Sequence, residues 1–300
     1  ADRITVLRQG CAVATIPARD VDAVSLGEMM VGELRTSDRE AAKSSPIREG
    51  APVLETRELW VSGDRSPHLV KDVSFSVRRG EVLGIAGIAG GGQIELLEAI
   101  AGIRPVERGT TWLHGQDINN LTTRERQTRG IAFIPADRHR DGLIGPMSLA
   151  ENLALCSRRD SSVSRFGILL PRSIEGRAQS LMRRFDIRAF GPAAPAANLS
   201  GGNQQKLILA RELSRDPEVL LCCYPTRGLD FAATRAIHDE LTQAAQRGAA
   251  VIIVSIDLVE LLELSDRLIV IQAGRITGEV EPDQVSVAEV GVMLGGGIAT

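Results

Sequence analysis

The chain has 300 residues and a net charge of −3, with 43% hydrophobic, 24% charged and only 3% aromatic residues. This length can bury the core of one large domain or of two modest ones. The near-neutral charge and the few aromatic rings argue against a nucleic-acid partner, and the longest apolar runs are too short to span a bilayer.

The start of the chain carries no signal-peptide pattern. The cysteines have no metal-ligand spacing; they are Cys11, Cys156, Cys222 and Cys223. Unpaired buried thiols are typical of a reducing compartment. We therefore expect a cytosolic protein, or the cytosolic part of a larger one, with no cluster of metal ligands.

Residues 1–15 resemble residues 265–279. Both segments begin with Asp-Arg and continue as an alternating apolar strand, a glycine turn and a second short strand, at an offset of 264 positions (265 − 1). Two further identities occur at the same offset, Met29 with Met293 and Gly32 with Gly296. An internal repeat of domain size indicates tandem copies of one fold.

Residues 35–52 are polar, charged and interrupted by proline and glycine, which is typical of a linker. We therefore expect residues 1–34 to be the tail of a preceding domain. Residues 53–300 would then form a complete domain.

The complete domain shows two kinds of strand pattern. Three segments alternate like half-buried antiparallel strands: 52–61, 69–77 and 109–118. Four continuous apolar runs fit parallel strands that are buried on both faces: 81–87, 130–135, 218–224 and 249–256. Helical patterns separate these runs at 92–101, 203–215 and 231–247. The pattern predicts an α/β fold with a mostly parallel core sheet and an antiparallel β flank, and the stretch from about 140 to 204 predicts a helical subdomain.

A glycine-rich loop follows the first apolar run. Its glycines are Gly87, Gly90, Gly91 and Gly92. Such a loop between a strand and a helix can turn backbone N–H groups toward a phosphate. The phosphate-loop pattern G-x-x-x-x-G-K-[ST] fits as far as Gly92 and then fails, because Gln93 replaces the lysine and Ile94 replaces the hydroxyl residue. We expect weakened nucleotide binding; a plain strand-to-helix turn is the alternative.

Residues 198–221 read NLSGGNQQKLILARELSRDPEVLL. Ser200, Gly201 and Gly202 precede a predicted helix, so hydroxyl and N–H groups can face an anion. This segment resembles the signature region of ABC-type ATPases, in the form found in simple-sugar and nucleoside importers. The resemblance implies a P-loop NTPase fold of the ABC type. It also implies that the signature closes over ATP held by a partner domain.

The same resemblance identifies the other family positions in this sequence. Residues 218–230 resemble the second acidic motif and the D-loop, with Cys223 at the Mg²⁺-associated aspartate, Tyr224 at the catalytic glutamate and Asp230 near the domain contact. Ile256 takes the position of the switch histidine. Residues 133–143 resemble the Q-loop, with Ala136 at the usual Gln or Glu position. A thiol is a poor Mg²⁺ ligand and a phenol is a poor base at neutral pH, so no catalytic position is intact.

The sequence assigns no definite functional role to Trp60 or to the histidines. Trp60 fits either an adenine-stacking residue or an aromatic side chain at the solvent edge of a strand. The histidines are scattered without ligand spacing, so we expect them at the surface: His68, His114, His139 and His238.

The resemblance implies the ATP-binding subunit of a sugar or nucleoside importer. Its cofactors would be ATP and Mg²⁺, with Mg²⁺ weak or absent at this domain's own site. Its partners would be another ABC domain, in the same full-length chain or in a homodimer, then permease subunits and, indirectly, a substrate-binding protein, at the inner face of the cell membrane. The chain by itself is predicted to be hydrolytically inactive. A tandem ABC protein acting on ribosomes or in DNA repair, and a non-hydrolytic scaffold, are the alternatives.

Overall fold

The computed structural model describes residues 2–8, 11–20, 50–64, 66–157, 163–165 and 168–295. The strands are β1 Arg3–Arg8, β2 Cys11–Pro17, β3 Leu54–Val61, β4 Val70–Val77, β5 Val82–Gly87, β6 Arg108–Leu113, β7 Gln116–Asp117, β8 Ile131–Ile134, β9 Ser164–Arg165, β10 Ile168–Leu169, β11 Val219–Cys223, β12 Ala250–Ser255, β13 Arg267–Gln272 and β14 Arg275–Val280. The α-helices are α3 Gln93–Ala101, α4 Thr123–Thr128, α5 Leu149–Ala154, α6 Pro171–Arg184, α7 Gly201–Leu213, α8 Phe231–Gln246, α9 Leu258–Leu264 and α10 Val287–Leu294. Short 3₁₀ or π turns complete the set: η1 Ala18–Asp20, η2 Arg138–Gly142, η3 Leu155–Ser157, η4 Ala196–Asn198 and η5 Pro282–Gln284.

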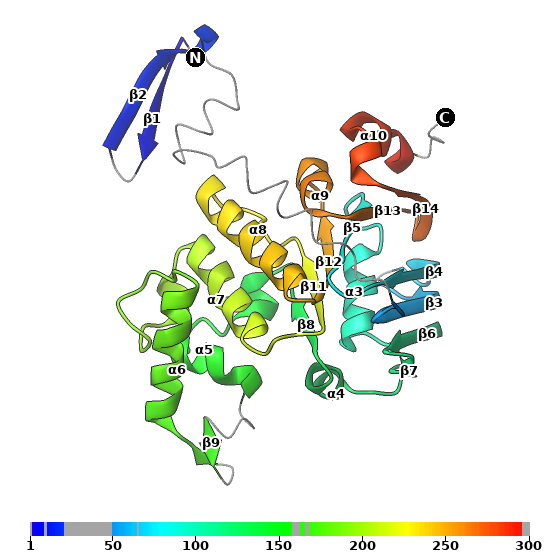
Figure 1. Ribbon diagram of the computed structural model, residues 1–300, viewed down its shortest axis with the longest axis horizontal. Helices are drawn as coiled ribbons and strands as arrows, with labels where there is room; N and C mark the ends of the chain where they lie inside the picture. The colour runs from blue at the N-terminus through cyan, green and yellow to red at the C-terminus, as the bar shows by residue number, and fades with distance from the viewer. Residues whose placement is uncertain are drawn as a thin grey trace.

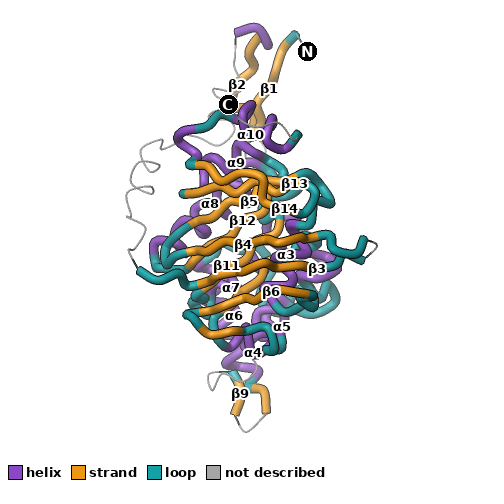
Figure 2. The backbone as a smooth tube through the Cα atoms, turned by 90° about the vertical axis from the view of Figure 1, so that its right-hand side faces the viewer, coloured by secondary structure: helices purple, strands orange, loops and turns teal. Residues whose placement is uncertain are grey.

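The core is a six-stranded sheet in the order β14-β13-β5-β12-β11-β8. Neighbouring strands from β13 to β8 are parallel, and β14 pairs antiparallel with β13. A separate antiparallel sheet has the order β4-β3-β6-β7. Figure 2 shows the strands of both sheets stacked across the molecule. The predicted α/β class, with its parallel core and antiparallel flank, is confirmed.

Both faces of the parallel sheet are buried. Along β12, Val251 and Ile253 pack into the cluster on the helical side, whereas Ile252 and Val254 pack into the cluster on the side of the second sheet. The same alternation runs through β5 and β11. The continuous apolar runs therefore form strands covered on both faces.

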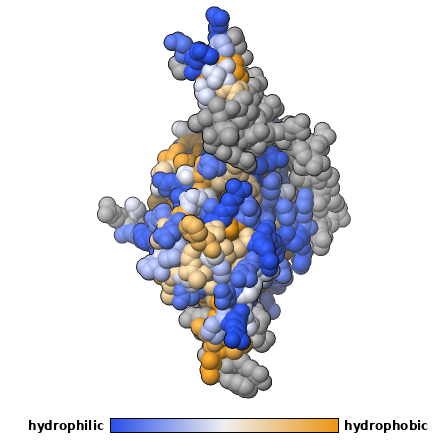
Figure 3. Space-filling view, turned by 90° about the vertical axis from the view of Figure 1, so that its left-hand side faces the viewer, coloured by the Kyte–Doolittle hydropathy of each residue, from blue (hydrophilic) through white to orange (hydrophobic). Residues whose placement is uncertain are grey.

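Helices α7, α8 and α9 lie against one side of the parallel sheet, with α5 and α6 packed on α7, and the antiparallel sheet covers the other side with α3 between the two sheets (Figure 1). The stretch expected to lack strands also contains the two-residue strands β9 and β10, which pair antiparallel. Their apolar side chains Ile168 and Leu169 are exposed, and apolar atoms are visible at the lower end of the molecule in Figure 3. No helix among the described residues is long and apolar enough to cross a membrane.

The two hairpins that resemble each other in sequence also match in backbone detail. The pair Ile4–Ile16 in the first hairpin corresponds to Leu268–Val280 in the second. Each hairpin shifts register at the equivalent step, after Val6 in one and after Val270 in the other, and each leads into a short 3₁₀ turn, η1 or η5. The strand, bulge and turn of the expected repeat are thus conserved in register. Met29, Gly32, Gly296 and most of the predicted linker lie outside the described residues.

Arg126 on α4 fixes the C-terminal end of α3, the helix that follows the glycine loop. Its guanidinium is buried and donates to the carbonyl oxygens of Ala99 at 2.7 Å and Ile100 at 2.8 Å. It also donates to the carbonyls of Leu121 and Asn119. Burial lowers the pKa of Arg126. The buried cation therefore supplies donors to carbonyls of the last turn of α3, where intrahelical donors run out.

We predict that Arg126→Met lowers the free energy of unfolding by about 3 kcal/mol, because buried carbonyl groups lose a charged donor. Chemical denaturation monitored by circular dichroism measures this change. The matched control is Arg124→Met, two residues earlier on the same helix and exposed. Equal losses in the two variants would contradict the role given to Arg126.

Candidate functional site

The glycine loop connects the end of β5 to the start of α3, as the sequence predicts. Gly87 is the last residue of β5, and Gly92 is the N-cap of α3 with a left-handed φ of 100°. Gly90 is also left-handed, at φ 81°. These positive φ angles are readily adopted only by glycine. The loop therefore retains a backbone shape suited to close approach by a ligand.

Gln93 folds back into this loop. Its side chain is 1% exposed, and its Nε2 donates to the carbonyl oxygen of Ile88 at 3.1 Å. The backbone N–H of Gly91 donates to the same oxygen at 2.9 Å. A Cβ atom added at Gly87 would lie 1.5 Å from Gln93 Nε2. The Gln93 amide thus packs directly on Gly87 and makes its hydrogen bond inside the loop, without bringing a positive charge.

Two more predicted site residues emerge beside this loop, at the carboxyl edge of the parallel sheet. β5 pairs with β12 through Ala86 and Ser255, so Gly87 and Ile256 leave adjacent strands at the same level. The Tyr224 N–H donates to the carbonyl oxygen of Val254 at 2.8 Å. The structure therefore brings together the glycine loop, Tyr224 and Ile256.

The residues that the family resemblance places at the Mg²⁺ positions do not fit that ion. Cys223 is fully buried at the end of β11, and burial raises the pKa of its thiol well above the usual value. Ile94 packs against the apolar cluster between the two sheets. A protonated thiol and an aliphatic chain are poor ligands for a hard cation. Among the described residues, no group of three or more His, Cys, Asp or Glu side chains is arranged to hold a metal.

Tyr224 does not provide a base at neutral pH. Burial raises the pKa of its phenol above the ordinary value. The residue is half-buried and has a left-handed φ of 49°. Ile256, at the switch position, is 60% exposed and cannot accept or donate a proton. The carboxyl edge therefore carries neutral groups at each position that the family resemblance assigns to catalysis.

The signature residues form the N-terminus of α7. Ser200 is the N-cap, and its Oγ accepts from the Asn203 N–H at 3.4 Å and from Asn203 Nδ2 at 2.9 Å. The helix begins at Gly201, two residues before the predicted start. The first N–H groups of a helix lack intrahelical acceptors, and a Cβ at Gly202 would lie 2.8 Å from that of Ala233 on α8. Close helix packing therefore explains the glycine at 202, while the helix end is suited to an anion.

Arg138, in the Q-loop segment, connects this helix end to the turn after β11. Its Nη1 donates to the carbonyl oxygen of Arg227 at 3.0 Å. Its Nη2 lies 2.9 Å from where a Cβ would stand on Gly201. Asp137 caps the π turn η2, and hydrogen bonds from the N–H groups of Arg140 and His139 lower the pKa of its carboxyl. The structure therefore places Arg138 against Gly201 of the signature.

Asp230 and Trp60 both have local partners. The Asp230 carboxylate caps α8 by accepting from the Ala233 N–H at 2.8 Å. The Trp60 ring lies 5.9 Å from the guanidinium carbon of Arg108 and 5.7 Å from that of Arg275. The ring is partly buried on β3, consistent with a strand aromatic that packs beneath cationic side chains.

A buried carboxylate near the site was not expected from the sequence. Glu260 on α9 accepts hydrogen bonds from Thr226, His238 and Ser255. The surface assignment is wrong for His238, whose side chain is 15% exposed and bonded to this carboxylate. The available signal was its position three residues before Leu241, because residues three apart on a helix share one face and Leu241 is buried.

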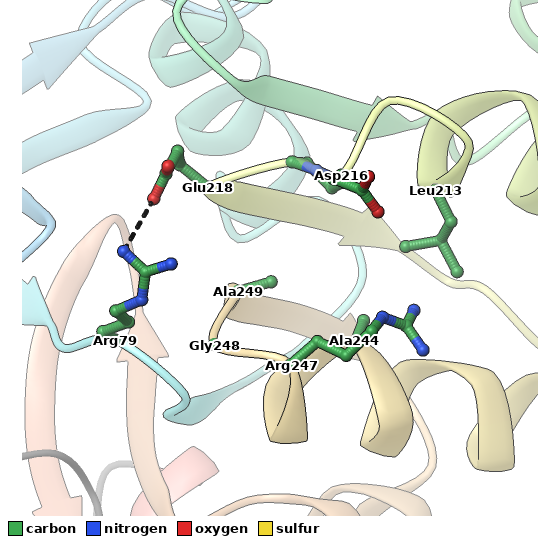
Figure 4. Close-up of a pocket in the computed structure, with 9 residues that line it drawn as sticks. Arg79, Leu213, Asp216, Glu218, Ala244, Arg247, Gly248 and Ala249 are labelled. Atoms are coloured by element: carbon green, nitrogen blue, oxygen red, sulfur yellow. Dashed lines mark hydrogen bonds and ion pairs between the residues drawn. The ribbon is translucent and has the colours of Figure 1, made fainter.

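A pocket elsewhere in the described residues does not belong to this site. Arg79, Asp216, Glu218 and Arg247 are among the residues lining it, and Arg79 pairs with Glu218 at 3.4 Å (Figure 4). It lies where β11 and β12 begin, at the opposite edge of the sheet. Its volume of about 90 Å³ is too small for a nucleotide, since ligand pockets usually measure roughly 300–1,000 Å³.

Relatives of this chain are import proteins. It is 42% identical over 297 residues to the nucleoside import ATP-binding protein NupA of Lactococcus lactis subsp. cremoris (strain MG1363), covering 99% of this chain and 58% of that protein. It is 39% identical to the guanosine import ATP-binding protein NupO of Bacillus subtilis (strain 168), covering 98% and 57%. The glucose import ATP-binding protein TsgD13 of Haloferax volcanii is 41% identical, with 100% and 54% covered. The chain thus spans little more than half the length of these relatives.

Solved structures share the fold. An ATP-binding subunit of an ABC transporter superposes with a TM-score of 0.67 at 23% identity, over 81% of this chain and 99% of that one. A dimeric ATP-binding cassette bound to ADP and phosphate gives 0.65 at 21% identity, over 76% and 98%. The ABC transporter family model matches residues 70–227, more than half of the chain. The chain therefore belongs to the ABC transporter family, as an ATP-binding cassette with the fold that its glycine loop and signature helix predicted.

Proposed function

We propose that this chain is part of the ATP-binding subunit of an importer for a simple sugar or a nucleoside. Its signature turn completes the ATP site of another cassette, and its own site does not hydrolyse ATP. The names of the relatives support this class of cargo, because they are import proteins for nucleosides, guanosine and glucose. Permease subunits, and indirectly a substrate-binding protein, are the remaining partners, at the inner face of the membrane.

The proposal rests on the difference between the glycine loop and the signature turn at Ser200. At the glycine loop, the Gln93 amide occupies the space above Gly87, and Cys223 is a buried neutral thiol. A neutral hydrogen bond contributes about 1 kcal/mol, against roughly 1.5–3 kcal/mol for one involving a charged group. At Ser200, by contrast, a capped helix N-terminus is suited to an anion. This difference favours a domain that assists a neighbour's hydrolysis while holding its own nucleotide weakly.

The neighbour is proposed to be a preceding cassette in the same polypeptide. In the complete domain, β13 pairs with β14 on one edge and with β5 on the other. The equivalent strand β1 has the same hairpin partner and the same bulge, and within the described residues its sheet contains only β1 and β2. A strand from a preceding domain would pair along the free edge of β1. Residues 1–34 would then be the tail of that domain and 35–52 the linker.

In the full-length protein with its permease, we predict that Ser200→Arg lowers the ATPase rate by at least about 100-fold. A bulky cation at the helix N-terminus would displace the γ-phosphate and block closure. Gln93→Ala should change the rate by less than about threefold, because it removes one neutral hydrogen bond. Phosphate release at saturating ATP measures both rates.

The matched control is Ser173→Arg, an exposed serine on α6, which should retain the parent rate. Equal effects of the changes at Ser200 and Gln93 would show that the two sites are not asymmetric. Retention of hydrolysis by Ser200→Arg would eliminate the proposed role of the signature.

The chain alone should release no phosphate from Mg²⁺·ATP above background, because its own site lacks a base and a metal ligand. A radiolabelled-ATP hydrolysis assay tests this expectation. A turnover that Gln93→Ala or Tyr224→Phe abolishes would contradict it.

A further inference from the structure

Glu260 lies where four segments of the domain meet. Its Oε1 accepts from Thr226 Oγ1 at 2.6 Å and from His238 Nε2 at 2.8 Å. Its Oε2 accepts from Ser255 Oγ at 2.5 Å. These donors come from the turn after β11, from α8 and from the last residue of β12, while Glu260 itself is on α9. One carboxylate is therefore hydrogen-bonded to three other segments of the domain.

The carboxylate is buried, and its donors compensate for the loss of water. Glu260 is 5% exposed and Ser255 is 4% exposed. Burial by itself would raise the pKa of the Glu260 carboxyl, but the hydrogen bonds from His238, Ser255 and Thr226 lower it below its usual range. A buried charge is tolerated only when it is paired and hydrogen-bonded. The arrangement thus favours an ionised acceptor with little freedom to move.

The first segment that Glu260 fastens is the turn from Thr226 to Asp230. Within this turn the Leu229 N–H donates to the Thr226 carbonyl at 3.1 Å, and Asp230 caps α8. The hydroxyl of Thr226 is the connection between the turn and α9. Arg138 of η2 donates to the Arg227 carbonyl of the same turn, and its guanidinium lies against Gly201 at the signature end of α7.

The second segment runs from Ser255 to Asp257 and contains Ile256. Ser255 Oγ accepts from the Asp257 N–H at 3.1 Å while it donates to Glu260. Asp257 in turn caps α9 by accepting from the Val259 N–H at 2.9 Å. The segment after β12 and the turn after β11 are therefore both hydrogen-bonded to one side chain, that of Glu260.

We propose that Glu260 is a positioning residue for ATP hydrolysis at the neighbouring cassette. It acts as an ionised acceptor that holds the Thr226–Asp230 turn in a fixed relation to the segment after β12 and, through Arg138, to the signature turn at Ser200. This inference rests on the proposed function, since this chain's own site supplies no catalytic group. The role proposed for the buried carboxylate is indirect. It acts through the turns that face the neighbour.

Thr226→Val provides the sharpest test, because valine has the same shape as threonine and removes only the hydroxyl donor. Glu260 would keep its bonds to His238 and Ser255. In the full-length protein with its permease, kcat for ATP hydrolysis should fall about tenfold, since a small misplacement of groups around the reacting phosphate is costly. The KM for ATP should stay within about twofold, because the phosphates are held by the neighbour's loop.

Glu260→Gln and Glu260→Ala remove the carboxylate to different degrees, so their activities can be ranked. Glutamine keeps an oxygen for Thr226 and His238 and can donate to Ser255, whose hydroxyl also accepts. It should therefore retain more activity than alanine, which leaves all three donors without this acceptor, the buried Ser255 hydroxyl among them. A drop in kcat of about 100-fold is expected for alanine.

The matched control is Glu81→Gln. Glu81 is fully buried and bonded to Arg267, but it lies at the amino edge of the same sheet. Its substitution should lower the melting temperature while leaving kcat per folded molecule unchanged. If Thr226→Val and the Glu260 variants behave in the same way as this control, Glu260 is only structural and the inference is overturned. An unchanged kcat in Thr226→Val would overturn it as well.

Ser200→Arg, assayed in parallel, separates this inference from the function on which it rests. If Ser200→Arg abolishes hydrolysis while Thr226→Val and the two Glu260 variants keep the parent kcat, the positioning role of Glu260 is rejected and the proposed function stands. Retained hydrolysis in Ser200→Arg rejects the proposed function, and with it the route by which Glu260 would act.

Discussion

Burial of both faces of the parallel sheet is the constraint on which the rest of the structure depends. Because helices cover one face and the antiparallel sheet covers the other, the strands can be reached only at their ends (Figure 1). Strand pairing then fixes which residues emerge together at the carboxyl edge. Gly87, Tyr224 and Ile256 are neighbours for this reason, although they are far apart in the sequence.

The chemistry of that edge differs from that of the signature turn. Gln93, Cys223 and Tyr224 are uncharged: the Gln93 amide bonds to the backbone of the loop, and burial raises the pKa of both the Cys223 thiol and the Tyr224 phenol. Ser200 is exposed at a capped helix N-terminus. Stabilisation of developing negative charge requires preorganised donors, and the first N–H groups of α7 at Ser200 are such donors. This contrast is the basis of the proposed asymmetry between the two sites.

Much of this arrangement was predictable from the sequence. Two predictions that were wrong concern the start of α7 and the position of His238. Apolar runs and glycines placed the strands, the loop and α3 because their patterns are local. The start of α7 was predicted two residues late, since two glycines disfavour a helix interior by propensity, yet Ser200 caps the helix and Gly202 allows close packing on α8. His238 was expected at the surface because nothing local to it shows that a carboxylate from α9 lies opposite.

The sequence by itself determined the fold class and the family, because these follow from residue identity and spacing along the chain. The likeness of the two hairpins was also visible in the sequence. Only the tertiary structure decided that the Gln93 amide fills the space over Gly87, that Arg138 lies against Gly201, and that Glu260 gathers three donors. These contacts join residues from different elements, and the packing of those elements is set by the whole core rather than by any one segment.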